Sequence, residues 1–108
     1  MRKRIYLAGK YSADNILKVL DNITRGNRVA AKYIKQGYAV FSPFLDYQFH
    51  FFENLEIKDY YEYSIAFLVV CDEMWVLPDW KNSKGTMAEI KIAEENNIPI
   101  KYLTEDDL

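Results

Sequence analysis

A glutamate near the start of a predicted helix offers the clearest candidate chemistry in this sequence. Residues 82–99 read NSKGTMAEIKIAEENNIP, a polar turn with a glycine followed by a helical pattern. Ser83, Gly85 and Thr86 can present hydrogen-bond donors to an anion at the helix N-terminus, where the helix dipole also favours negative charge. Glu89 lies one turn further along the same helix. If its side chain points into a cleft, this carboxylate is a candidate catalytic group.

The same residues also fit a purely structural interpretation. Thr86 and Glu89 match the S/T-x-x-E spacing of a capping box, in which the glutamate caps its own helix and stays in solvent. The two interpretations differ in burial, because a catalytic glutamate faces a cleft. Sequence spacing leaves both open.

A second candidate anion site follows the first predicted strand. The run RIYLA, residues 4–8, ends at Gly9, and the next positions hold Lys10, Tyr11 and Ser12. A glycine turn between a strand and a helix exposes backbone N–H groups that suit a phosphate or carboxylate, and here a lysine and a hydroxyl are added. The turn lacks G-x-G-x-x-G and G-x-x-x-x-G-K-[ST], so a dinucleotide site and an ATP loop lose support. A plain turn glycine remains an open alternative.

Aromatic side chains make up 16% of the sequence and gather between residues 38 and 63. Several fall in one short segment, more than a loop needs for its own packing: Phe41, Phe44, Tyr47, Phe49, Phe51 and Phe52. An exposed apolar patch usually marks a partner or ligand surface, so we expect a homodimer contact or a wall on which a base stacks. Trp80 leaves a similar choice open, between stacking on a base or sugar and covering the edge of the core.

Three other side chains with reactive groups have structural interpretations. His50, the single histidine, has no acidic or cysteine partner at metal-ligand spacing, so we expect an ordinary loop residue and no metal site. Cys71 precedes a predicted buried strand and fits the core better than a nucleophile. As the single cysteine, it also excludes an intramolecular disulfide. Asp72 fits a role in ordering a turn.

Apolar patterns predict strands that alternate with helices along the chain. Short apolar runs next to glycine or proline indicate strands at residues 4–8, 38–43, 73–78 and 98–103. Apolar positions at helical spacing predict a long helix with a stripe from Ile16 through Leu17 and Leu20 to Ile34, then helices over 57–70 and roughly 85–97. Residues 44–56 have no clean period and are expected to form a loop or lid.

The ends of the long helix are marked by polar residues and glycine. Asp14 or Asp21 could cap its start, and Gly37 is typical of a helix stop. Gly26 either interrupts the helix or permits close packing against it.

Strands that alternate with helices predict a parallel sheet with right-handed crossovers. In such sheets, ligands bind beyond the carboxyl ends of the strands, near the point where the strand order reverses. That rule places residues 9–12, 42–44 and 77–89 on one rim of the sheet.

Length and charge narrow the class of protein. The 108 residues fit one domain, residues 1–108, and a net charge of −2 gives no basic footprint for a nucleic-acid polymer. The N-terminal MRKRIYLAG has too short an apolar run for a signal peptide, and no run approaches the roughly 20 residues of a membrane span. We therefore expect a cytoplasmic protein that binds a small molecule or a protein, with no membrane partner.

Taken together, these residues resemble the nucleoside 2-deoxyribosyltransferase-like superfamily. The stretches that carry the resemblance are IYLAG, GYAVFSP and CDEMWVLPDWKNSKGTMAEIKIAEENNIPI, which span nearly the whole chain in the expected order. The last third is the most specific part. The resemblance implies a single-domain, three-layer α/β fold of the flavodoxin/Rossmann type, with four or five parallel strands and no cofactor.

The resemblance also implies roles for individual residues. Glu89 would be the nucleophile that attacks the anomeric carbon, and Tyr6 would sit beside the sugar. Gly9, Ser83 and Gly85 would hold the 5′ end of the nucleotide, with Ser83 matching the serine that contacts phosphate in members acting on monophosphates. Lys10 replaces a common proline and adds a cation near the phosphate. Tyr11, Ser12, Phe44 and Trp80 complete the expected substrate contacts.

One position departs from the family pattern. Catalytic members usually carry an aspartate eight residues before Asp72, where it helps protonate the leaving base, and this chain has Ser64. Asp59 and Glu62 are nearby but on other faces of the predicted helix. We expect a nucleotide N-glycosidase acting on a nucleoside 5′-monophosphate, or the related deoxyribosyl transfer between bases, in a homodimer. A non-catalytic nucleotide-binding module and a structural partner protein are the alternatives.

Overall fold

The four apolar runs of the sequence form the strands of one parallel sheet. In the computed structural model, which describes residues 1–108, the strands are β1 (Arg4–Ala8), β2 (Ala39–Phe41), β3 (Glu73–Val76) and β4 (Ile100–Tyr102). Their order across the sheet is β2-β1-β3-β4, and every neighbouring pair is parallel. The chain therefore moves outward from β1 in both directions, which creates a switch point between β1 and β3.

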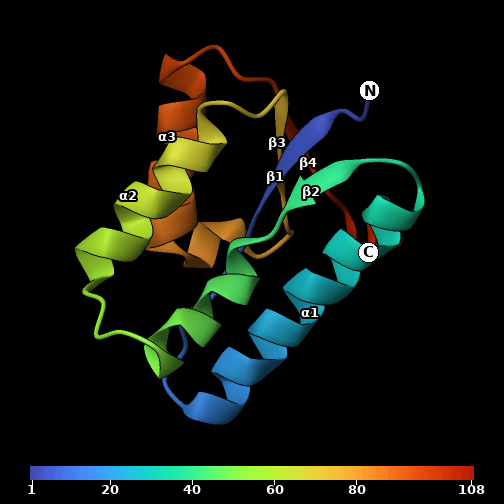
Figure 1. The fold of residues 1–108 in the computed structure, drawn as a ribbon. Helices are drawn as coiled ribbons and strands as arrows, with labels where there is room; N and C mark the ends of the chain where they lie inside the picture. The colour runs from blue at the N-terminus through green and yellow to red at the C-terminus, as the bar shows by residue number, and fades with distance from the viewer.

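Helices cover both faces of this sheet (Figure 1). The helix α1 (Ile16–Lys35) lies on one side, and α2 (Ile57–Leu68) and α3 (Lys84–Glu95) lie on the other. Three 3₁₀ segments complete the chain: η1 (Pro43–Phe51), η2 (Trp80–Asn82) and η3 (Glu105–Asp107). The predicted three-layer α/β fold of the flavodoxin/Rossmann type is confirmed, with four strands. None of these helices combines the length and the apolar character needed to cross a membrane.

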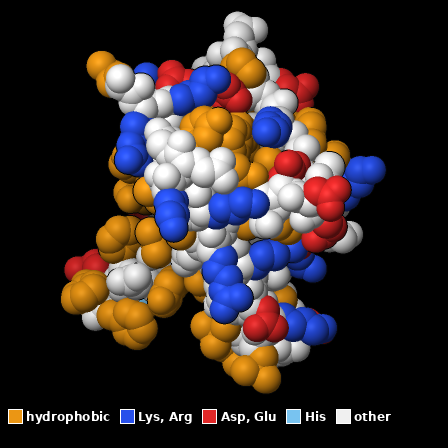
Figure 2. Space-filling view, turned by 90° about the vertical axis from the view of Figure 1, so that its right-hand side faces the viewer, with side chains coloured by type: hydrophobic (Ala, Val, Ile, Leu, Met, Phe, Trp, Pro, Cys, Tyr) orange, Lys and Arg blue, Asp and Glu red, His pale blue; other side chains and the backbone are white.

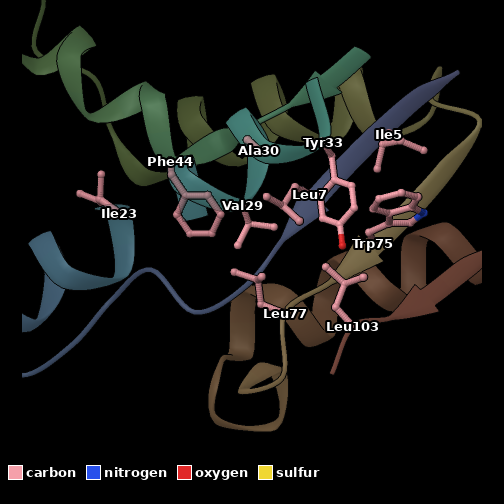
Figure 3. Packing of buried hydrophobic residues seen from close by; sticks show 10 residues of the cluster. All are labelled: Ile5, Leu7, Ile23, Val29, Ala30, Tyr33, Phe44, Trp75, Leu77 and Leu103. Atoms are coloured by element: carbon pink, nitrogen blue, oxygen red, sulfur yellow. The ribbon is translucent and has the colours of Figure 1, made fainter. Parts of the chain in front are cut away.

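Alternate residues of the central strands point into two separate cores. Ile5 and Leu7 of β1 face α1, and Figure 3 shows Leu7 beside Val29 and Ala30 of that helix and Ile5 near Tyr33 and Trp75. Tyr6 and the other even-numbered residues face α2 and α3, where Leu68, Ile90 and Ala93 cover them. This alternation is the period-2 pattern of a strand that is buried on both sides. It also fixes the face on which the Tyr6 side chain must lie.

The start of α1 differs from the sequence prediction. Asn15, rather than Asp14 or Asp21, is the N-cap, and its side chain accepts a hydrogen bond of 3.0 Å from the Lys18 N–H. Ile16, Leu17 and Leu20 were expected in the core, but their side chains are exposed. Ile34, at the other end of the stripe, is exposed as well, so the covered part of the stripe runs from Ile23 to Tyr33. Gly37 follows the helix with φ of 105°, as predicted for a helix stop.

Residues 43–51 form the 3₁₀ segment η1, where the sequence predicted an unstructured loop or lid over 44–56. Its main anchor is Phe44, which is fully buried against α1, while Phe49 and His50 contact Tyr63 and Tyr60 of α2. Gly26 makes the close packing of Phe44 possible, because a Cβ at this position would lie 2.3 Å from the Phe44 ring. Close packing, one of the two interpretations of Gly26, is therefore the correct one.

The other elements match their predictions with shorter ends. Strands β2, β3 and β4 each lose residues at one or both ends relative to 38–43, 73–78 and 98–103, because the flanking residues belong to turns. Helix α2 ends at Leu68, and α3 ends at Glu95, shortly before Asn97 adopts a φ of 57°. Of the α3 residues expected to face inward, Ile90 and Ala93 are buried, and Ile92 is half-buried at the core edge.

The contact between Gly26 and Phe44 yields a stability prediction. Gly26→Ala should lower the free energy of unfolding by about 1–3 kcal/mol, since the new methyl group overlaps the Phe44 ring and either the ring or α1 must shift. Urea denaturation measures this change. Gly85→Ala is the matched control, because a Cβ there has open space, and we expect it to be neutral or stabilising by up to about 1 kcal/mol. Equal effects of the two substitutions would contradict the packing argument.

Candidate active site

A cavity of about 690 Å³ opens at the carboxyl ends of β1 and β3. These are the two central strands, between which the strand order reverses. Four segments surround the cavity: the turn after β1, the η1 segment, one face of α2 and the start of α3. The residues that line it include Gly9, Lys10, Tyr11, Ser12, Phe44, Asp46, His50, Tyr60, Tyr61, Ser64, Asn82, Ser83, Lys84, Gly85, Thr86 and Glu89. Segments distant in sequence thus meet where parallel sheets usually bind ligands.

Glu89 points into this cavity and accepts a hydrogen bond from the Tyr6 hydroxyl. Tyr6 lies in the middle of β1, buried and paired in register with Phe41 and Met74, so its ring has little freedom to move. Its ring also stacks on Phe41 at 5.5 Å. The glutamate is therefore held by a rigid strand.

A capping role for Glu89 is excluded by the cap geometry of α3. The N-cap is Ser83, which accepts a bond of 3.2 Å from the Thr86 N–H and one of 2.9 Å from the Thr86 hydroxyl. Glu89 lies further into the helix and contacts none of the first-turn N–H groups. Of the two interpretations that spacing left open, the cleft interpretation is the one that matches the structure.

Burial changes the acid–base behaviour of this pair. Loss of solvent raises the pKa of Glu89 from its ordinary value of 4.5 to about 7, against the opposing effect of the Tyr6 hydrogen bond. Burial, reinforced by the negative charge of Glu89, also raises the pKa of Tyr6 well above 10, so the phenol stays protonated and keeps donating. A carboxylate with such a perturbed pKa in a cleft is typical of a functional group.

The start of α3 provides donors for an anion. The Lys84 and Gly85 N–H groups lie in the first turn, where a helix has no internal partners for them. Ser83 uses its oxygen to accept both bonds from Thr86, so its own hydroxyl proton is free for a ligand. The Arg25 guanidinium of α1 donates a 2.8 Å hydrogen bond to the Asp79 carboxylate. This bond holds the turn that precedes α3 against α1.

The turn after β1 lines the same cavity as this helix start. Gly9 lies so close to β3 that a Cβ would meet Leu77 at 2.5 Å, so a packing constraint requires the glycine. The next residue, Lys10, lines the cavity, as does Lys84 at the start of α3. Neither lysine forms an ion pair with any carboxylate of the chain. Both charges are therefore available to an anionic ligand.

Aromatic rings form another part of the wall. Tyr11 stacks on Phe44 at 6.1 Å, and His50 lies against Tyr60 at 4.8 Å. The Tyr60 hydroxyl is buried and has no hydrogen-bond partner within the protein. His50, which the sequence indicated to be an ordinary loop residue, thus lies at the cavity, although its own side chain remains exposed.

Asp46 is the residue that sequence reasoning missed. It lies in the first turn of η1, half-buried, and lines the same cavity as Glu89. Burial raises its pKa from 3.8 to about 6, partly offset by the Tyr11 hydroxyl and by His50. Its charge is felt by Glu89, whose pKa it raises. The only sequence signal was its position two residues beyond the predicted rim segment 42–44.

Ser64, which occupies the position of the usual aspartate, is buried on the cavity face of α2 and lies beside the Tyr6 hydroxyl, whose pKa it lowers. Asp59 and Glu62, on the same helix, point elsewhere: Asp59 takes part in the capping box of α2, and Glu62 is near Lys58 on the exposed side. No carboxylate of α2 therefore enters the site.

One expected substrate contact lies outside the cavity. Trp80 packs against Tyr102 of β4 at 5.2 Å and against the edge of the second core, and Lys81 covers its ring. Trp80 does not line the cavity, and its ring covers the core edge, which was the second of its two interpretations. Cys71 is half-buried and its pKa is raised to about 11 by burial, and Asp72 accepts a 2.7 Å bond from the Arg4 N–H. Both have the structural roles predicted for them.

Residues 3–102 match a family model described as a domain of unknown function, DUF4406. Because the match covers almost the whole chain, this protein belongs to that family. No curated protein matches it.

The raised pKa of Glu89 predicts how stability depends on pH. Between about pH 4.5 and 7 the folded chain keeps a proton on Glu89 that the unfolded chain releases, so this residue lowers stability as pH rises through that range. Glu89→Gln removes the effect. The variant should exceed the wild type by about 3 kcal/mol at pH 8 and match it at pH 4, as measured by urea denaturation.

Glu62→Gln serves as the control, because the Glu62 side chain is 63% exposed and should show the wild-type dependence on pH. If Glu89→Gln has the same pH profile as the wild type, the carboxylate is not buried as described.

Proposed function

We propose that this protein is a nucleotide N-glycosidase, which cleaves the bond between sugar and base of a nucleoside 5′-monophosphate, or transfers the deoxyribosyl group to another base. The observation that carries this proposal is the half-buried Glu89 carboxylate, which lines the cavity and is held by Tyr6. The resemblance of the sequence to nucleoside 2-deoxyribosyltransferases assigns the nucleophile to this same residue.

The reaction would follow the logic of a retaining glycosidase. The ionised Glu89 attacks the anomeric carbon as the base leaves, and a glycosyl ester forms on the carboxylate. Water then releases the sugar phosphate, or a second base accepts the sugar. The Tyr6 hydroxyl keeps Glu89 oriented and stabilises its charge until attack.

Different residues of the cavity suit different parts of the substrate. The free N–H groups of α3, the Ser83 hydroxyl and the unpaired Lys10 and Lys84 favour a phosphate beside them. The aromatic side chains Tyr11 and Tyr60 favour a flat base in another part of the cavity. Phe44, expected as a substrate contact, is fully buried and supports the Tyr11 ring instead. A sugar between the phosphate and the base would lie against Glu89, with its orientation fixed by the bound phosphate.

Release of free base tests the proposal. The wild type, incubated with each deoxynucleoside 5′-monophosphate, should release base, and Glu89→Ala should reduce the rate by at least about 10³-fold, since the nucleophile is lost. Chromatography of the products measures it. The corresponding nucleosides, which lack phosphate, should react with a higher KM. Equal base release by Glu62→Ala and the wild type is the expected control result, and equal release by Glu89→Ala would sink the proposal.

A nucleotide-binding module without catalysis is the second candidate, and Ser64 in the place of the usual aspartate favours it. The same samples separate the two. Titration calorimetry that shows tight nucleotide binding, together with no base release by the wild type, would select the binding module.

We also propose a homodimer. The side chains of Phe51, Phe52 and Ile57 are 76%, 82% and 88% exposed beside the cavity, and Ile16 and Leu17 at the start of α1 are likewise uncovered. Figure 2 shows hydrophobic side chains gathered at the lower end of the molecule. Patches of this kind usually bind a partner.

Sedimentation should find a dimer for the wild type, and a monomer or a weakened dimer for Phe52→Ser combined with Ile57→Ser. Tyr102→Ser, at an exposed residue of β4, serves as the control and should leave the dimer intact. A monomeric wild type at micromolar concentration would refute the homodimer.

A further inference from the structure

The site contains a second carboxyl group, on a segment that the resemblance does not assign to catalysis. Asp46 belongs to η1, the green segment that follows β2 in Figure 1, whereas the aspartate usual in the related enzymes would come from α2. Ser64 holds that position in α2, and a serine hydroxyl is too weak an acid to protonate a leaving base. The reaction therefore needs a proton donor from another element.

Asp46 is the only carboxyl group besides Glu89 that lines the cavity. The groups close enough to interact with it come from each neighbouring element: Tyr6 of β1, Tyr11 of the following turn, His50 of η1 itself, Tyr60 of α2 and Glu89 of α3. Asp46 forms no ion pair, and neither lysine of the cavity lies within ion-pair distance of it. The Tyr11 hydroxyl and His50 favour the ionised form of Asp46, but burial outweighs them and raises its pKa.

We propose that Asp46 is the catalytic acid that protonates the leaving base, in place of the aspartate that α2 lacks. This inference rests on the proposed N-glycosidase function. It assigns the acid to η1, near Tyr11 and Tyr60, whose aromatic rings line the cavity and provide a surface for the base.

The proposed reaction of a purine nucleotide has two stages, attack by Glu89 and hydrolysis of the intermediate. A lone pair of the Glu89 carboxylate forms a bond to C1′, and the bond from C1′ to the base nitrogen breaks with its electrons going to the base. The Asp46 carboxyl transfers its proton to a ring nitrogen of the base, which leaves neutral. Water then attacks C1′ and frees Glu89, and the proton lost by that water returns to Asp46.

The protonation states of the pair are compatible with these roles. The pKa values are about 6 for Asp46 and about 7 for Glu89, so the two carboxyl groups together hold one proton near neutral pH. Because Glu89 has the higher pKa, the shared proton lies mainly on Glu89, and the active form is the minor one, with the proton on Asp46 and the charge on Glu89, where the Tyr6 hydroxyl donates to it. Two carboxyl groups with different tasks in one cleft are a common arrangement for acid–base chemistry.

A substrate that needs no protonation separates the acid from the nucleophile. Deoxyguanosine 5′-monophosphate methylated at N7 already carries a positive charge on its base, so the base leaves without a proton. We expect Asp46→Asn to lower kcat/KM by about 10²–10⁴-fold for the unmethylated nucleotide and by less than about threefold for the methylated one. Glu89→Ala should lose activity on both, and Glu62→Gln should lose none.

The dependence on pH supplies a second readout. The wild type should lose activity above neutral pH with the unmethylated nucleotide, because Asp46 has then released its proton. That alkaline loss should be absent with the methylated nucleotide, and absent from the residual activity of Asp46→Asn.

The outcomes are distinct from those that test the function itself. An equal loss on both substrates, or no loss on either, would overturn the acid role of Asp46 while leaving Glu89 as the nucleophile. Full activity of Asp46→Asn on the methylated nucleotide would show that the variant is folded. If neither substrate gives base release that depends on Glu89, the proposed function fails, and the role of Asp46 fails with it.

Discussion

The hydrogen bond from the Tyr6 hydroxyl to the Glu89 carboxylate joins the centre of the sheet to the start of α3. It places a titratable group where water is largely excluded, and burial is the main reason that its pKa is raised to about 7. An unpaired carboxylate in such surroundings would be strongly unfavourable. Tyr6 offsets part of that penalty, and because β1 is paired on both sides, the phenol cannot move away. The remaining parts of the site are arranged around this pair.

Charge is distributed unevenly along the cavity. Glu89 and Asp46 line it, and each opposes the ionisation of a neighbouring carboxyl or phenol group. Lys10, Lys84 and the free N–H groups of α3 line it as well. An anionic group entering the cavity is therefore attracted to the lysines and the helix start and repelled by the two carboxyl groups, which favours one direction of binding for a charged ligand. The fold creates this polarity because α3 begins, and β1 ends, at the same edge of the sheet.

Much of the fold follows from local sequence signals. The four strands are short apolar runs next to glycine or proline, and their alternation with helical patterns leads directly to a parallel sheet and to the rim that carries the cavity. Glu89, Ser83, Gly85, Gly9 and Lys10 were all placed on that rim correctly. What spacing alone could not decide was whether Glu89 faces solvent, since that depends on Tyr6, which is distant in the sequence.

The errors of sequence reasoning share one physical cause. Asp46, Trp80 and the first turns of α1 all depend on contacts with remote segments rather than on their own neighbours. Phe44 pins η1 through Gly26, and this contact turns Asp46 inward, although residues 44–56 show no period. Trp80 looked like a ligand contact by its place on the rim, but Tyr102 from the last strand draws its ring away. The α1 stripe is exposed at both ends, where no partner covers it.

The distance along the chain between Tyr6 and Glu89, 83 positions, has a consequence for how the protein comes into being. Contacts between such remote residues are slow to form, because the entropy of a large loop is lost before the contact is gained. The first strand leaves the ribosome early, and the helix with the glutamate leaves it near the end of synthesis. A nascent or partly unfolded chain therefore has its carboxylate in water with an ordinary affinity for protons, and its reactivity appears only when folding is complete.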